Sequence, residues 1–284
     1  MEKHSTPLVS FIVPTLNRPV ELERFLQSSL MQMRQDFEVL VIDQSYERVQ
    51  EFAAQYPRVR YFYSERKGLA ANRNVGIQNA YGELLIFADD DCVLPDDYVE
   101  KLSSYAPQLS DKLLFGFGNV LNLEDGQPFV PTFRPPSKPV SAWNCDTLCS
   151  VSLVFSRRCF EIVGLFDDEF GVGAHYPAGE ELELLLRMLK KDISGVYLSK
   201  LVIFHPKRSR EAHLTERYEK YGFGQGAVAR KHLGNVVYFV RFLYSLSRPL
   251  GGLVLSLLRR NGLAQLYASS LRGKVQGFFD YGNR

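Results

Sequence analysis

The chain has 284 residues, of which 45% are hydrophobic and 23% are charged, and its formal net charge at pH 7 is +2. This is the composition of an ordinary soluble globular protein, long enough to bury a full core as one large α/β domain or as a domain with an extension. The four cysteines lack the spacing of a zinc or redox site, and no apolar segment precedes a small-residue cleavage site near the N-terminus. We therefore expect reduced thiols and no secretory signal.

Charge is distributed unevenly along the chain. Residues 205–284 carry 14 Lys or Arg and 4 Asp or Glu, a net charge of +10, which leaves −8 for residues 1–204. An acidic body with a basic tail predicts that the tail meets something anionic, such as lipid headgroups, nucleic acid or a polyanionic substrate.

Strand and helix patterns alternate through the first half of the chain. Short apolar runs, typical of strands buried in a parallel sheet, occur at 8–14, 37–43, 59–63 and 84–88. Helical patterns follow them at 19–33, 47–56, 68–82 and 96–109. This order predicts a parallel sheet with right-handed crossovers, in which ligands bind at the carboxyl ends of the strands.

The alternation weakens after residue 113. Strand patterns occur at 113–123, 149–155 and 201–206, and a proline-rich loop is expected at 126–139. A glycine-rich stretch at 164–179 precedes an amphipathic helix at 180–191. Beyond residue 206 the sequence is basic and has helical patterns.

Three carboxylates, Asp89, Asp90 and Asp91, follow the apolar run 84–88 directly. Adjacent like charges repel one another, so something positive should compensate them, and Mg²⁺ or Mn²⁺ is a candidate because these ions prefer carboxylate oxygens. Three interpretations fit the segment. It is a D-x-D pair whose cation bridges a diphosphate, the D-x-D-x-[TV]-L motif of phosphatases with an aspartate nucleophile, or an Asp-rich turn.

The position of the segment bears on the phosphatase interpretation. That motif normally follows the first strand of its domain, whereas here three strand–helix units come before it. Asp167 and Asp168 could serve as the later acidic motif of such a phosphatase. A metal-bound diphosphate and a phosphatase therefore both stay open on the acidic residues alone.

At this point the chain resembles family 2 glycosyltransferases with a GT-A fold. The resemblance covers residues 7–206 and rests on stretches in the family's order and spacing: "VSFIVPTLNRP", "FEVLVIDQS", "GLAANRNVGIQNAYGELLIFADDDC", "GLFDDEFGVG", "GEELELLLRMLKK" and "VIFHP". The tail, through "YGFGQGAVARKH" and "SLRGKVQGFF", also resembles bacterial members that build surface polysaccharides.

The resemblance implies a GT-A domain at residues 1–210, with a Rossmann-like nucleotide-binding half and a mixed, mainly parallel sheet, and a basic, amphipathic helical extension at 211–284. It also implies a metal-dependent, inverting transferase. The donor would be a nucleotide-sugar, the cofactor Mn²⁺ or Mg²⁺, and the acceptor a saccharide or a lipid-linked saccharide.

The family's site residues carry over to positions at the expected strand ends. Asp43 would hydrogen-bond the nucleotide base and Arg73 would approach the donor, although a turn aspartate and a surface arginine are the ordinary alternatives. The full set of donor-binding candidates is Pro14, Thr15, Asn17, Arg18, Asp43, Lys67, Arg73, Asp89 and Asp90. The metal candidates are Asp89, Asp91 and His205, of which the histidine could equally be structural.

The catalytic candidates are Glu180 and Glu181, at the start of the amphipathic helix. The family's helix opens with "GED", and here the sequence is "GEE", so the resemblance aligns Glu181 with the general base. Carboxylates at a helix N-terminus also stabilise the helix, which is the structural alternative. A second departure is "DQSY" after the second strand, which keeps only Asp43 of the usual acids.

The tail leaves its role open. Residues 236–260 are apolar but interrupted by Arg241, Arg248 and Pro249, so the runs are shorter than the roughly 20 residues that a spanning helix needs. We expect a cytoplasmic protein held at the inner face of the membrane by anionic lipid, or a helical cap packed on the domain or on a second copy. A polyanion-binding module is the remaining alternative, and no nucleic acid is expected.

Overall fold

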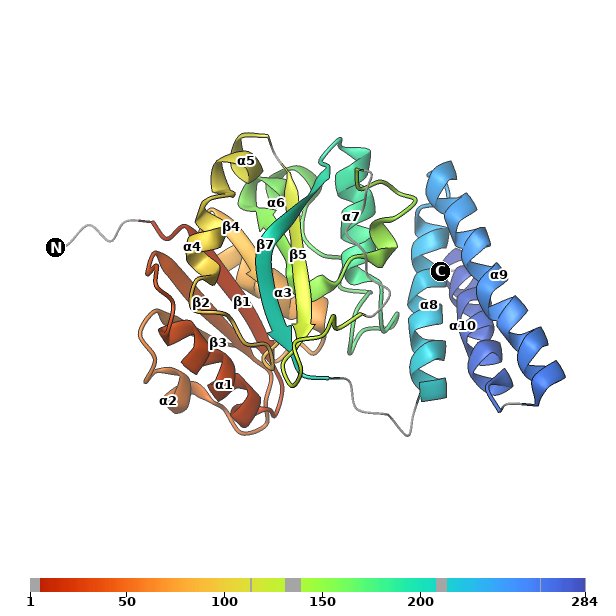
Figure 1. Cartoon of the computed structure of the whole chain (residues 1–284), viewed down its shortest axis with the longest axis horizontal. Helices are drawn as coiled ribbons and strands as arrows, with labels where there is room; N and C mark the ends of the chain where they lie inside the picture. The colour runs from red at the N-terminus through yellow and green to blue at the C-terminus, as the bar shows by residue number, and fades with distance from the viewer. Residues whose placement is uncertain (1–5, 113, 131–138, 208–213, 261, 284) are drawn as a thin grey trace.

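The computed structural model describes residues 6–112, 114–130, 139–207, 214–260 and 262–283. Its centre is a seven-stranded sheet in the order β3-β2-β1-β4-β6-β5-β7 (Figure 1). The strands are β1 (Val9–Thr15), β2 (Phe37–Asp43), β3 (Val59–Tyr63), β4 (Leu84–Phe87), β5 (Phe115–Asn122), β6 (Leu153–Ser156) and β7 (Gly195–His205). The helices are α1 (Pro19–Leu30), α2 (Gln50–Ala53), α3 (Leu69–Asn79), α4 (Tyr98–Ser103), α5 (Ala106–Asp111), α6 (Arg157–Val163), α7 (Glu180–Lys190), α8 (Leu214–Lys231), α9 (Val236–Arg259) and α10 (Ala264–Gly282).

The direction of the strands decides where the polar strand ends meet. Strands β1 to β4 pair in parallel, β6 is antiparallel to both β4 and β5, and β5 is parallel to β7. All the strands except β6 therefore end at one edge of the sheet, toward which the arrowheads point in Figure 1.

The continuous apolar runs of the central strands reflect burial on both faces of the sheet. In β1, Phe11 and Val13 face one hydrophobic cluster while Ile12 faces another, because successive side chains of a strand point to opposite faces. The expected mixed, mainly parallel sheet is confirmed.

Several element boundaries differ from the expectation. The helix expected at 47–56 is only α2 (Gln50–Ala53), and the one expected at 96–109 is divided into α4 and α5. Pro107 lies in the first turn of α5, where its missing N–H costs nothing, whereas inside a continuous helix it would remove a hydrogen bond. Strand β6 begins only at Leu153, after a 3-10 turn, and β7 begins at Gly195. Residues 131–138 of the proline-rich loop lie outside the described part of the chain.

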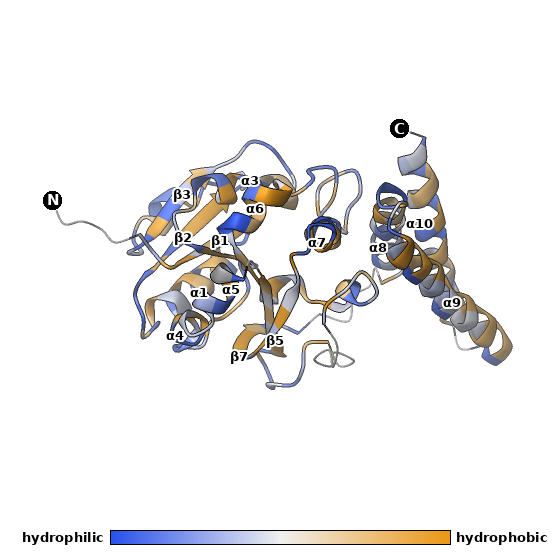
Figure 2. Ribbon diagram, turned by 90° about the horizontal axis from the view of Figure 1, so that it is seen from above, coloured by the Kyte–Doolittle hydropathy of each residue, from blue (hydrophilic) through white to orange (hydrophobic). Residues whose placement is uncertain are grey.

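The tail forms three helices. Figures 1 and 2 show α8 next to the α/β domain and α9 and α10 on its far side. Gly222 and Gly226 of α8 meet Gly273 and Gly277 of α10, and an added Cβ at any of the four would collide with backbone atoms of the other helix. Within the described residues, no helix is long and apolar enough to cross a membrane.

A buried ionic network fastens the tail to the α/β domain. The Glu183 side chain of α7 is fully buried, and it pairs with Arg187 of the same helix, with Lys231 of α8 at 2.7 Å and with His232 at 3.3 Å. Lys231 also pairs with Asp167. Burial alone would raise the pKa of Glu183, but the hydrogen bonds from His232 and Arg187 and the charge of Lys231 lower it to about 2.

Replacing Glu183 with Gln should therefore destabilise the fold. Removing one partner of a buried ion pair leaves uncompensated charge, so the free energy of unfolding at pH 7 should fall by about 3–5 kcal/mol in urea titrations. The lowered pKa places this contribution above the ordinary pKa of 4.5, and it should be lost as the pH falls toward 2.

The matched control is Glu216→Gln, in an exposed ion pair with Lys220 on α8. It should change stability by less than about 0.5 kcal/mol at any pH. Equal losses in both variants, or a pH-independent loss in Glu183→Gln, would contradict this account of the network.

Candidate functional site

A cleft of about 1270 Å³ opens at the sheet edge where the strands end. Its walls come from α1, from the segment after β4, from the start of α7, from the end of β7 and from one face of α8. Of the residues expected at the site, the cleft brings together Arg18, Arg73, Asp89, Asp91, Glu180, Glu181 and His205.

Arginine side chains compensate the three adjacent carboxylates. Arg18 spans two of them, with Nη1 2.7 Å from Asp90 Oδ1 and Nη2 2.7 Å from Asp91 Oδ2. The Thr15 hydroxyl donates to the other oxygen of Asp90 at 2.8 Å. Burial nevertheless dominates at Asp90 and raises its pKa to about 7. Asp90 therefore anchors the loop after β1 and does not line the cleft.

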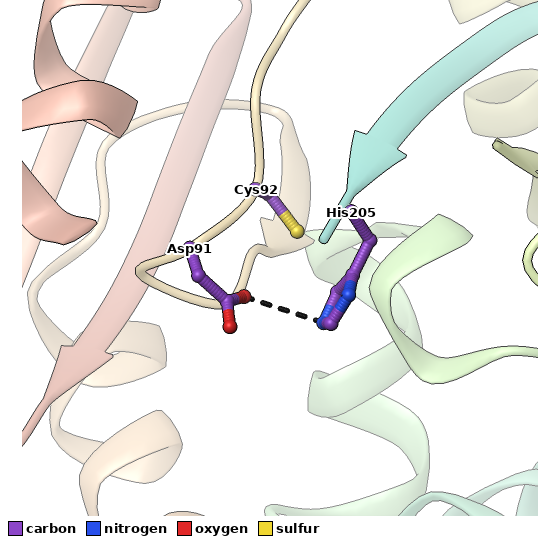
Figure 3. A group of neighbouring side chains, drawn as sticks. All are labelled: Asp91, Cys92 and His205. Atoms are coloured by element: carbon purple, nitrogen blue, oxygen red, sulfur yellow. Dashed lines mark ion pairs between the residues drawn. The ribbon is translucent and has the colours of Figure 1, made fainter. Parts of the chain in front are cut away.

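Asp89, Asp91 and His205 face one another across the cleft, and Figure 3 shows the Asp91 carboxylate turned toward the imidazole. His205 Nε2 lies 3.3 Å from Asp91 Oδ1 and 3.7 Å from Asp89 Oδ2. Its Nδ1 lies 2.8 Å from the Pro206 carbonyl. Because a carbonyl can only accept, Nδ1 carries a proton, and Nε2 is the ring nitrogen that faces the two carboxylates, whose charges help to raise the pKa of His205.

This arrangement fits a divalent cation. Asp91 Oδ1 is buried without a hydrogen-bond partner, and such an orphaned oxygen is what a metal would satisfy. Two carboxylates and an imidazole suit Mg²⁺ or Mn²⁺. The Cys92 sulfur lies near Asp91 and His205, and burial raises the pKa of its thiol well above the ordinary value.

Arg73 connects the acidic segment to the start of α7. It comes from α3, is 1% exposed, and lies 2.6 Å from Glu181 Oε1, 3.3 Å from Glu180 Oε1 and 4.0 Å from Asp89 Oδ1. The alternative that Arg73 is a surface residue is therefore wrong. The Arg73 side chain therefore lies between Asp89 and the two glutamates and contacts all three carboxylates.

The two glutamates at the start of α7 have different surroundings. Helix α7 begins after Gly179, whose φ of 97° lies in the left-handed region that favours glycine. The Glu180 side chain is 6% exposed, and its pKa is raised by burial and by the charge of Glu181. The Glu181 side chain is 20% exposed. Glu181 is thus the one more open to an incoming molecule.

The remaining donor-binding candidates do not line the cleft. Asp43 is fully buried, and its carboxylate accepts hydrogen bonds from the Ser45 and Val49 N–H groups and from the Tyr61 hydroxyl. It shapes the loop after β2. The others outside the cleft lining are Pro14, Thr15, Asn17 and Lys67.

Two of these residues hold neighbouring loops together. Asn17 bonds to Ser45 and Tyr46, and the Lys67 ammonium donates to the Gln44 carbonyl at 2.6 Å. Both side chains therefore connect the loop after β2 to the segments before α1 and α3.

Sequence analysis missed part of the cleft. Phe129 packs against the His205 ring, with centroids 4.5 Å apart, and α8 contributes Arg217, Tyr221 and Gln225. The spacing of four residues places the three on one face of α8. The four-residue spacing is visible in the sequence, but whether that face of the helix points toward the cleft depends on how α8 packs against the α/β domain.

Comparisons with known proteins agree with this geometry. The family described as glycosyl transferase family 2 matches residues 10–126. The chain belongs to this family.

This family 2 chain is 31% identical over 233 residues to the O-antigen biosynthesis protein RfbC of Myxococcus xanthus, covering 73% of the chain and 18% of that protein. It is 36% identical over 96 residues to an uncharacterized glycosyltransferase of Rickettsia felis, covering 32% of the chain and 16% of that protein. The chain thus spans less than a fifth of either relative.

Solved structures confirm the GT-A fold of this family 2 chain. A crystal structure of S. aureus TarS, residues 1–349 in complex with UDP-GlcNAc, superposes with a TM-score of 0.58 at 19% identity, covering 82% of this chain and 69% of the 1–349 chain. The phosphatase and polyanion-binding alternatives are not favoured by these matches.

The fit of the site to a cation predicts a metal response that depends on Asp91. Adding Mn²⁺ at about 100 times its Kd should raise the Tm of the protein by roughly 5 °C, and Asp91→Asn should abolish the rise while staying folded. Differential scanning fluorimetry with and without chelator measures it.

The control for this variant is Asp97→Asn, in a half-buried pair with Lys101 outside the cleft. It should keep the full metal response. The metal site would be contradicted by a wild-type protein whose Tm does not change with Mn²⁺ or Mg²⁺. It would also be contradicted by an Asp91→Asn variant whose Tm rises as much as that of wild type.

Proposed function

We propose that this protein is a metal-dependent glycosyltransferase that moves a sugar from a nucleotide-diphospho-sugar to a hydroxyl group of a saccharide or lipid-linked saccharide, with inversion at the anomeric carbon. The observation that carries the proposal is the buried Arg73, which joins Asp89 to Glu180 and Glu181 within one cleft. Arg73 thereby holds the proposed diphosphate site, at Asp89, next to the proposed base, at the start of α7.

The donor side is formed by Asp89, Asp91, His205 and Arg18. The first three would hold Mn²⁺ or Mg²⁺, which, when bound, stabilises the negative charge that develops on the leaving diphosphate. The guanidinium of Arg18 adds a fixed positive charge suited to phosphate oxygens. TarS binds UDP-GlcNAc on the same fold, which supports a nucleotide-sugar donor here.

The acceptor side is formed by the start of α7. The acceptor oxygen attacks the anomeric carbon and forms the new glycosidic C–O bond. The bond from that carbon to the diphosphate oxygen breaks, and its electron pair leaves with the diphosphate. The hydroxyl proton passes to the Glu181 carboxylate. Attack opposite the leaving group inverts the configuration, and Arg73 keeps Glu181 oriented for this transfer.

Glu181→Gln tests the base directly. Gln keeps the shape and removes basicity, so kcat should fall by about 10²–10⁴-fold while donor affinity stays nearly unchanged. Hydrolysis of UDP-, GDP- and dTDP-sugars is a suitable assay, because water can replace the acceptor and its proton also needs a base. Glu180→Gln, the matched neighbour, should reduce kcat less.

The opposite ranking would move the base to Glu180. Near-normal turnover in both variants would leave neither glutamate as the base. Absence of donor binding and hydrolysis across the three nucleotides in the wild-type protein would contradict the proposed function itself.

We further propose that α9 holds the enzyme against an anionic membrane surface. Residues 236–260 include no Asp or Glu, and Arg248, Arg259 and Arg260 are exposed. One outward face of α9 is apolar and exposed along its length, and positive charge beside an apolar face is the combination that binds anionic lipid headgroups. The face consists of Val236, Val240, Leu243, Leu250, Val254 and Leu258.

Leu258→Asp should weaken flotation with vesicles that contain anionic phosphatidylglycerol, because it places a negative charge on that face. Leu258 is 76% exposed, so the change should not disturb the core. Val20→Asp on α1, at 74% exposure, is the matched control and should float like wild type. High salt should also reduce flotation. If the wild-type protein does not float with these vesicles at low salt, the proposal that α9 binds an anionic membrane surface is contradicted.

A further inference from the structure

One wall of the cleft comes from α8. Arg217, Tyr221 and Gln225 line the cleft at intervals of four residues, beside the backbone of Pro177, Ala178 and Gly179. Figure 1 shows α8 beginning at the sheet edge where the parallel strands end, which is the edge that carries the cleft. The tail is therefore part of the site's enclosure.

This wall is held at a fixed position relative to the catalytic glutamates. Gly224 of α8 lies against the Ala178 carbonyl, and an added Cβ there would collide with that backbone. Ala178 precedes Glu180 by two residues, so the contact joins α8 to the start of α7. A second contact between the same two helices is the ion pair of Lys231, at the end of α8, with Glu183, in the first turn of α7.

The reaction geometry assigns this wall to the acceptor. In-line displacement requires the acceptor oxygen to approach the anomeric carbon from the side opposite the diphosphate. Asp89, Asp91 and His205 occupy the diphosphate side. An acceptor whose hydroxyl meets Glu181 lies at the start of α7, where Gly224 of α8 packs against Ala178 and where α8 lines the same cleft.

The side chains on this wall suit a sugar ring. Tyr221 is 41% exposed and offers an aromatic face with a polar hydroxyl, a combination that packs on the C–H face of a pyranose and bonds its hydroxyls. The Arg217 guanidinium lies 5.1 Å from the centroid of that ring and limits its movement. Gln225, one turn further on, adds an amide that can donate and accept.

We propose that Arg217, Tyr221 and Gln225 form an acceptor subsite for a neutral pyranose, with Tyr221 as its platform. The proposal rests on the proposed function, since it names the acceptor side of that reaction. It makes the helical tail a determinant of acceptor specificity, in addition to any contact with membrane.

The test compares two tyrosines of α8. Tyr221 lines the cleft, whereas Tyr218, at 45% exposure, does not, so Tyr218→Ala is the matched control. The probes are p-nitrophenyl α- and β-hexopyranosides of the gluco, galacto and manno series, and their binding is followed by saturation-transfer difference NMR. Binding of UDP, GDP and dTDP is measured separately by calorimetry.

We expect Tyr221→Ala to weaken pyranoside binding roughly 3- to 10-fold, with nucleotide binding unchanged. Tyr221→Phe, which keeps the ring, should restore most of the binding, and Tyr218→Ala should behave as wild type. In transfer assays the loss should appear in the acceptor KM and leave the donor KM within about twofold.

Three results would overturn the subsite: no pyranoside binding to the wild-type protein, unchanged binding in Tyr221→Ala, or equal losses in Tyr221→Ala and Tyr218→Ala. Each of these can occur with normal nucleotide binding, which leaves the proposed function intact. Loss of nucleotide binding in the wild-type protein would instead contradict the proposed function.

Discussion

The site depends on one buried cation. Arg73 is 1% exposed, and a guanidinium at that depth is tolerated only because carboxylates surround it. Its partners come from segments far apart in the sequence: Asp89 after β4, and Glu180 and Glu181 at the start of α7. Through these contacts one side chain connects the donor side of the cleft to the base side.

The acidic segment after β4 illustrates how the same charges serve folding and binding. Arg18 and Thr15 hold Asp90, and this fixes the loop from which Asp89 and Asp91 project. Asp91 accepts from Arg18 with one oxygen and leaves the other without a hydrogen bond beside His205. The folded chain therefore compensates most of the charge by itself, and the remaining oxygen is the one that a divalent cation would satisfy.

The helical tail belongs to the site as much as the sheet does. Glycines of α8 and α10 let the two helices touch at the backbone, and Gly224 does the same between α8 and the segment before α7. Lys231 then ties α8 to Glu183. One face of α8 lines the cleft while the outward apolar face of α9 stays exposed, so the two faces belong to different helices of the bundle.

The sequence by itself determined the parallel sheet, the position of the acidic segment and the start of α7, because these depend on local apolar periodicity and on turn residues at strand ends. It also indicated Asp89 and Asp91, since polar residues after parallel strands meet at one edge, and the family resemblance added His205 and Glu181. Tertiary packing alone decided that Asp43 is enclosed by its own loop, that Arg73 is buried between three carboxylates, and that Tyr221 faces the cleft. Those outcomes depend on which segments meet across long separations in the chain, and periodicity along one segment carries no information about its distant neighbours.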